Sequence, residues 1–104
     1  MKQNIQESVT IPYDKIDILC RTHSVQKLSL FGSILRDDFR PDSDIDVLIE
    51  FEPNAEVTLF DMGGVQFELS ELFAREIDLK TPDFLSRYFR ERILSEARVI
   101  YERR

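Results

Sequence analysis

Two aspartates at the start of an apolar run are the side chains in this sequence with the clearest capacity for chemistry. Asp44 and Asp46 open the run that ends at Phe51. If residues 44–51 form a strand, successive side chains alternate between its faces, so both carboxylates lie on one face, opposite apolar residues. Two carboxylates side by side at a strand end provide oxygen ligands for a hard divalent cation.

A Gly-Ser pair, Gly32-Ser33, precedes these aspartates with ten residues in between. It ends a first apolar segment, residues 25–31, and Gly32 permits a tight exit from a strand. We expect residues 33–38 to form a short helix, whose first turn would offer backbone N–H groups, a hydroxyl and a positive dipole end to an anion. Together with the carboxylates, this turn makes up a metal–triphosphate site.

Each of these residues also has a purely structural role open to it. An aspartate at a strand end often forms a turn or stays solvated, and Ser33 alone would more often cap a helix. Arg36 is one turn beyond Ser33 and could reach a phosphate, or it could form a salt bridge with a nearby carboxylate of Asp37, Asp38 or Asp42. The combination, rather than any single residue, favours the metal and phosphate site.

Asp78 is the candidate third carboxylate. It lies in the alternating segment 76–80, which reads as a strand, and Thr81-Pro82 closes that segment. If Asp78 completes the site, this strand must lie beside the strand that carries Asp44 and Asp46. The alternative is that Asp78 pairs with an arginine of the C-terminal helix.

The elements that must position these residues alternate along the chain. Apolar stripes at helical spacing predict a helix from residue 12 to about 23, a longer one from about Thr58 to Arg75, and a final one from 87 to about 97. The apolar face of the longer helix comprises Leu59, Met62, Val65, Gln66, Leu69, Leu72 and Phe73.

Strands are expected at residues 25–31, 44–51 and 76–80, with a short edge strand at 99–101. This order predicts an α/β (α+β) fold, in which a small mixed β-sheet of three to four strands carries helices packed on it. Gly63 and Gly64 weaken the longer helix by roughly 1 kcal/mol each. A close approach of that helix to the sheet would explain them.

Composition limits the function classes. With 104 residues, 42% hydrophobic and 33% charged, the chain fits a single domain over residues 1–104. No apolar run approaches the roughly 18 residues of a membrane span, and the N-terminus lacks a signal-peptide core, so we expect a cytoplasmic protein. Cys20 is the only cysteine, which excludes an intrachain disulfide and a cysteine-built zinc site.

Charge is unevenly distributed. Residues 87–104 hold six Arg against three Glu, which is a charge of +3. Because the net charge of the chain is −6, the other 86 residues carry −9. An acidic body argues against nucleic acid as the main ligand, because neutralising phosphates dominates that affinity. It favours a divalent cation and a basic protein partner, although net charge can also serve only solubility.

The string Gly-Ser-x-x-Arg at 32–36, followed by Arg-Pro-Asp-Ser-Asp-Ile-Asp-Val-Leu-Ile-Glu-Phe at 40–51, resembles the signature of the polymerase-beta-type nucleotidyltransferase superfamily. The small size of the chain makes it similar to the minimal nucleotidyltransferase (MNT) antitoxins of HEPN–MNT toxin–antitoxin pairs. The likeness continues to about Glu102. One departure is Asp37, where the family commonly carries a small residue, often Gly.

The resemblance implies a nucleotidyltransferase fold and a role for each matching residue. Asp44 and Asp46 would bind two Mg²⁺ ions, while Asp78 would bind the catalytic ion and take the proton of the acceptor. The segment 78–82 is similar to the family's strand that carries the third carboxylate. The nucleotide would be held by three residues: Gly32, Ser33 and Arg36.

The resemblance also implies an activity. It is that of an antitoxin in a type VII-like pair, which transfers AMP from ATP to a tyrosine of a HEPN ribonuclease toxin and forms a hetero-oligomer with it. One alternative is a non-catalytic antitoxin that neutralises the toxin by binding. Another is a nucleotidyltransferase acting on RNA or a small molecule, against which the acidic surface and the lack of a second domain weigh.

Overall fold

A four-stranded mixed sheet forms the centre of the computed structural model, which describes residues 9–103. Its strands are arranged in the order β3-β2-β1-β4 and comprise β1 (Val25–Phe31), β2 (Ile45–Phe51), β3 (Ile77–Lys80) and β4 (Arg98–Glu102). Strand β1 is antiparallel to both β2 and β4, whereas β2 and β3 are parallel. A parallel pair needs a crossover, and the longest helix supplies it.

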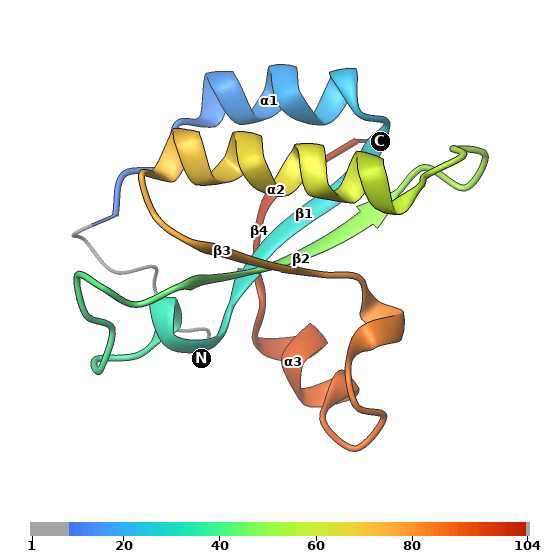
Figure 1. The fold of residues 1–104 in the computed structure, drawn as a ribbon. Helices are drawn as coiled ribbons and strands as arrows, with labels where there is room; N and C mark the ends of the chain where they lie inside the picture. The colour runs from blue at the N-terminus through green and yellow to red at the C-terminus, as the bar shows by residue number, and fades with distance from the viewer. Residues whose placement is uncertain (1–8, 104) are drawn as a thin grey trace.

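Helices α1 (Tyr13–Thr22) and α2 (Leu59–Phe73) lie side by side over one face of the sheet (Figure 1). The short helix α3 (Arg90–Glu96) lies on the other side. The main core lies beneath α1 and α2, where their buried side chains pack on the apolar face of β2, and its fully buried members include Ile16, Cys20, Ile45, Val47, Ile49, Val65 and Leu69. Burial raises the pKa of the Cys20 thiol to about 12, which keeps it protonated.

A second, smaller core covers part of the opposite face of the sheet. It joins Phe31 and Leu48 of the sheet to Leu85 and Ala97, and Ile93 of α3 packs against it. The two faces of β2 therefore differ: Ile45, Val47 and Ile49 face the large core, while the alternate positions share their face with this small cluster. The rest of that face is left for polar side chains.

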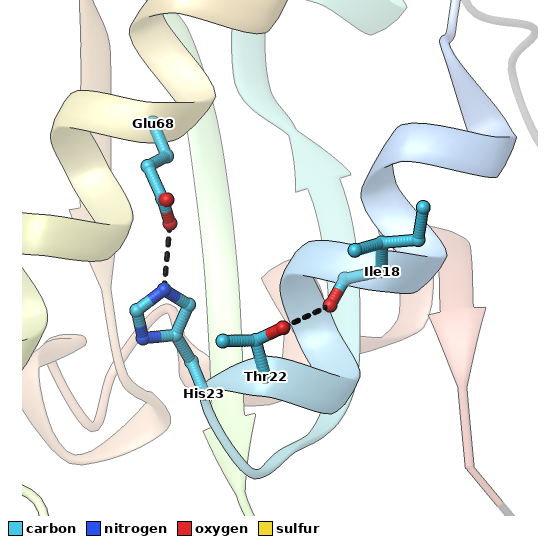
Figure 2. A network of polar contacts seen from close by, with 4 residues as sticks. All are labelled: Ile18, Thr22, His23 and Glu68. Atoms are coloured by element: carbon cyan, nitrogen blue, oxygen red, sulfur yellow. Dashed lines mark hydrogen bonds and ion pairs between the residues drawn. The ribbon is translucent and has the colours of Figure 1, made fainter.

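Two polar contacts lie at the C-terminal end of α1, one within the helix and one that joins its end to α2 (Figure 2). The Thr22 hydroxyl donates to the Ile18 carbonyl over 2.8 Å, and Nε2 of His23 lies 2.6 Å from Oε2 of Glu68. His23 is the residue that caps α1, so this contact holds the end of α1 against α2.

The predicted fold class is confirmed, because three helices pack on a four-stranded mixed sheet. The first strand has the expected bounds, α2 lies within 58–75, and the short C-terminal strand forms an edge of the sheet. Helix α3 is shorter than expected, and Leu59 of α2 is 84% exposed. The buried stripe of α2 is therefore narrower than the sequence indicates.

Two local expectations are wrong. The segment expected as a helix over 33–38 is a four-residue 3₁₀ turn, η1 (Gly32–Leu35), because Arg36 already has extended backbone angles. Gly63 and Gly64 do not approach the sheet: a Cβ on either would meet nothing within 4 Å, and both are exposed. They lie on the side of α2 that faces away from the core.

Within residues 9–103, no helix is both long enough and apolar enough to cross a membrane.

Candidate active site

Asp46 and Asp78 are neighbours on adjacent strands. The parallel pairing of β2 with β3 places them directly opposite one another, between the pairs Ile45–Ile77 and Val47–Leu79. Paired residues on parallel strands point to the same face. The expectation that the third strand lies beside the second is thus confirmed, and two of the three candidate carboxylates meet on the face opposite α1 and α2.

The surroundings of this pair raise the pKa of Asp46. Partial burial raises the pKa of Asp46 first, and the negative charge of Asp78 and a hydrogen bond with its carboxyl raise it further. The charge of Asp44 adds to the effect, while Lys80 opposes it. Lys80 donates from Nζ to Oδ2 of Asp78 over 2.7 Å. The surroundings of Asp46 therefore disfavour its charged form, and the Lys80 ammonium offsets this only in part.

Asp78 has no ion pair with an arginine of the C-terminal helix. Its ion pair is with Lys80, two residues along the same strand, and both side chains are about two-fifths exposed. A strand places residues i and i+2 on one face, which explains the contact. The alternative that tied Asp78 to the last helix is wrong.

Gly32 lies directly against Asp46. Its φ is +75°, in the left-handed region that disfavours other residues, and a Cβ built there would overlap Oδ2 of Asp46. Phe31, one residue earlier, is paired with Asp46 across β1 and β2. The Gly-Ser turn and the carboxylate pair thus form one site, because the β1–β2 register brings them together.

The turn itself differs from the expected anion cradle. Because η1 spans only four residues, little aligned backbone contributes to a dipole. Ser33 lies inside η1 rather than at its cap, and its carbonyl accepts the N–H of Arg36 over 2.9 Å. Any phosphate contact here would depend on individual N–H groups and side chains.

Arg36 faces a pocket of about 250 Å³ beside Gly32, formed between the end of β1 and α3. Its guanidinium also lies 3.5 Å from Asp38, with both side chains exposed, so the two roles left open for it are compatible. The opposite wall comes from α3 and the residue before it. The lining residues are Phe31, Gly32, Arg36, Phe89, Arg92, Ile93 and Glu96.

Arg92 and Phe89 were missed by the sequence analysis as individual site residues. Arg92 is an ordinary member of an arginine-rich helix, and its Nε lies 3.2 Å from Glu96, one turn along. Only the packing of α3 against the second core places it across the pocket from Arg36. The excess of arginine after residue 87 was the available signal, but it did not distinguish one arginine from another.

Arg75 is a third residue that the sequence did not single out. Its guanidinium donates to the carbonyls of Arg40 and Ser43 over 3.0 and 3.2 Å, and it lies 4.5 Å from the centre of the Phe39 ring. These contacts hold the connector that leads into Asp44. Arg75 comes directly after Ala74, the residue that caps α2, so the helix layer helps to fix the entry to β2.

Asp44 is exposed and lies just before β2. Among residues 9–103, no three His, Cys, Asp or Glu side chains are grouped closely enough to hold a metal ion as they stand. The donor chemistry nevertheless fits a hard divalent cation, since two carboxylates adjoin, a third is close enough to raise the pKa of Asp46, and Lys80 offsets this shift only in part. Asp44 and Lys80 would have to move for all three carboxylates to share one ion.

Comparisons with known proteins agree with this arrangement. The sequence model of the nucleotidyltransferase domain family matches residues 14–101. A Methanocaldococcus jannaschii protein named "Putative protein adenylyltransferase MJ0435" is 35% identical over 83 residues, which is 80% of this chain and 87% of that protein.

Solved structures have the same fold. One described as a "putative minimal nucleotidyltransferase" is 32% identical, with a TM-score of 0.68 over 82% of this chain and 85% of the other. A toxin–antitoxin complex with AMP-PNP has a TM-score of 0.69 at 18% identity, over 90% of this chain and 76% of the other. A tri-AMPylated Shewanella oneidensis HEPN toxin in complex with MNT antitoxin gives 0.56 at 19%, over 88% and 70%. On the family match and the 35% identical relative, this chain belongs to the nucleotidyltransferase domain family.

Proposed function

We propose that this chain is an MNT antitoxin that transfers AMP from ATP to a tyrosine of a HEPN-family toxin in the cytoplasm and so inactivates it. The observation that carries the proposal is the meeting of Asp46, Asp78 and Gly32 beside a pocket with arginines on two sides. Nucleotidyl transfer needs a carboxylate site next to a place for the triphosphate. The AMPylated HEPN toxin in one structural neighbour supports the choice of partner.

The three aspartates would hold two Mg²⁺ ions, with Asp78 on the catalytic one. Such ions neutralise the developing charge of the transferred phosphoryl group and favour attack by the acceptor hydroxyl. Two ions would also favour the charged form of Asp46, and Lys80 would release Asp78 to them.

Gly32 and Ser33 would face the triphosphate. At position 32, only a residue without a Cβ leaves room for the Asp46 carboxylate. Arg36 and Arg92, on opposite walls of the pocket, would pair with phosphate oxygens, and the Phe89 ring would contact the base. Arg92 would exchange its contact with Glu96 for the phosphate, which costs little at an exposed site.

In the reaction, the tyrosine oxygen forms a bond to the α-phosphorus of ATP while the bond to the bridging oxygen breaks. Pyrophosphate leaves with that oxygen, and Asp78 accepts the proton of the tyrosine hydroxyl. The toxin keeps AMP as a phosphodiester on its side chain.

A second candidate is a non-catalytic antitoxin that neutralises the toxin by binding alone. The Lys80–Asp78 ion pair and the exposed position of Asp44 favour it, because they leave the three carboxylates ungrouped. The two candidates differ in whether the aspartates are needed.

The test uses Asp46→Asn and Asp78→Asn, which keep side-chain size and remove charge, with ATP radiolabelled on its α-phosphate and a purified HEPN-family toxin as the acceptor. Transfer should fall by at least a hundredfold in both variants, since the metal site supplies most of the charge stabilisation. Exposed Asp42→Asn serves as the matched control and should transfer at the normal rate. Label appearing at the wild-type rate in the site variants would refute the assignment, and toxin silenced without any label would favour the binding candidate.

The Asp46→Asn variant also tests how stability depends on pH. The folded-state pKa of Asp46 lies above its unfolded value, so its charge opposes folding at pH values above the folded pKa, and this penalty vanishes below the unfolded pKa near 3.8. Metal-free Asp46→Asn should therefore be at least as stable as the wild type at pH 7, with no gain at pH 3. Urea unfolding at the two pH values checks this.

A further inference from the structure

The side of α2 that faces away from the core is apolar where a solvent-facing helix is normally polar. Phe60 is 90% exposed and Phe67 is 66% exposed, and Gly63 and Gly64 lie between them. The spacing i, i+3, i+4, i+7 places these four residues on one side of a helix. We call them the outer face of α2.

The fold does not explain the two glycines. Neither has a positive φ, and a Cβ on either would meet nothing within 4 Å. Alanine would fit at both positions and would favour the helix. The glycines instead leave a notch between two phenyl side chains, which would let the backbone of another helix approach closely.

Charge around the outer face indicates what fills the notch. Helix α2 contains three Asp or Glu and no Lys or Arg. Glu68 lies against His23, whereas Glu71, one turn beyond Phe67, is exposed. A second copy of this chain would place one acidic helix against another, which is unfavourable. An anionic membrane surface is disfavoured for the same reason. A helix with basic residues beside an apolar stripe is complementary.

We propose that the outer face of α2 docks a basic amphipathic helix of the partner protein, with a phenyl group of α2 on either side of it and its backbone over the two glycines. The proposal rests on the proposed function in taking the HEPN-family toxin as that partner. Helix α2 covers one face of the sheet (Figure 1). Asp46 and Asp78 point to the other face, because they alternate with Ile45, Val47 and Ile77 of the main core. Docking there retains the toxin while the carboxylate face stays open to the acceptor tyrosine.

The first experiment changes the glycines, with one variant read out by stability and another by binding. Gly63→Ala/Gly64→Ala should raise the urea midpoint of the free chain, because helix propensity improves and space is available. Gly64→Leu, which fills the notch, should weaken binding to the purified HEPN-family toxin that the wild type labels by at least tenfold in calorimetry. A Gly64→Leu chain that is folded and binds normally would overturn the proposal.

The second experiment removes the phenyl groups. Phe60→Ser/Phe67→Ser should lose at least tenfold in affinity for the same HEPN-family protein, and Glu71→Lys should weaken binding and reduce its salt dependence. Phe84→Ser is the matched control: Phe84 is 69% exposed, lies beyond β3 beside the second core, and should change affinity less than twofold.

The outcomes separate this proposal from the proposed function. If the Phe60→Ser/Phe67→Ser chain binds and labels the toxin normally, the docking site is wrong and the proposed function stands. If the wild type neither binds nor labels the toxin, the proposed function fails, and the docking proposal with it. Sedimentation of the free wild type as a dimer that Gly64→Leu dissociates, or binding to anionic vesicles, would assign the face to another occupant.

Discussion

At the scale of single residues, the three glycines fall into two groups: the backbone requires a glycine at position 32 but not at positions 63 and 64. Gly32 is required by its left-handed backbone and by the carboxylate of Asp46 beside it, whereas Gly63 and Gly64 are required by nothing within the chain. Substitution by alanine should therefore lower the free energy of unfolding at position 32 and raise it at position 63.

Gly32→Ala should lower the free energy of unfolding by about 1–3 kcal/mol, because it strains the backbone and displaces Asp46. Gly63→Ala should raise it by about 0.5–1 kcal/mol. Urea unfolding of both variants checks the pair, and MgATP affinity should fall only for Gly32→Ala. Equal stability changes of the same sign would contradict this reading of the turn.

At the scale of elements, α2 is started by a capping box. The backbone N–H of Asp61 donates to the Thr58 hydroxyl over 3.2 Å, and Oδ2 of Asp61 accepts from the Thr58 backbone N–H over 2.8 Å and from its hydroxyl over 2.9 Å. In the middle of the helix, the Gln66 side chain donates to the Ile77 carbonyl over 2.9 Å. The helix thus holds β3, and with it Asp78, against β2.

These hydrogen bonds lower the pKa of Asp61. A carboxylate with a depressed folded-state pKa stabilises the fold above its unfolded pKa, and this contribution is lost as the pH falls through the folded value. Asp61→Ala should therefore be less stable than the wild type at pH 7, with a difference that shrinks as the pH falls below about 3.8. Thr58→Ala should cost about 1 kcal/mol. Urea unfolding across this pH range tests both, and a pH-independent difference would exclude the charged cap.

At the scale of the whole molecule, the sheet separates two layers with different tasks. The helices on one face build most of the core, and the small cluster on the other face attaches α3 next to the carboxylates. The second wall of the pocket therefore depends on few apolar contacts.

Leu85→Ala should cost about 2–3 kcal/mol, because Leu85 is 6% exposed in that cluster, and it should weaken MgATP binding by shifting α3. Leu94→Ala, on the same helix but 45% exposed, should change stability by less than about 1 kcal/mol. Thermal unfolding with and without MgATP measures both effects. If MgATP stabilises the Leu85→Ala chain as much as the wild type, the pocket does not depend on the second core.

The sequence by itself predicted the order of the strands and the three main helices, and it singled out several residues that could do chemistry. Alternation in 44–51 and 76–80 predicted which side chains share a face, because a strand imposes a period of two whatever surrounds it. The composition of the 32–46 segment identified Gly32, Ser33, Asp44 and Asp46 for the same reason, since turn and strand chemistry are local.

Only the tertiary structure decided which of these residues meet. The β2–β3 register sets Asp78 opposite Asp46, the β1–β2 register sets Gly32 against it, and the second core brings Arg92 across from Arg36. It also decided that Gly63 and Gly64 face outward. Pairing of distant strands and packing of helices depend on contacts between residues far apart in the chain, and no local pattern carries that information.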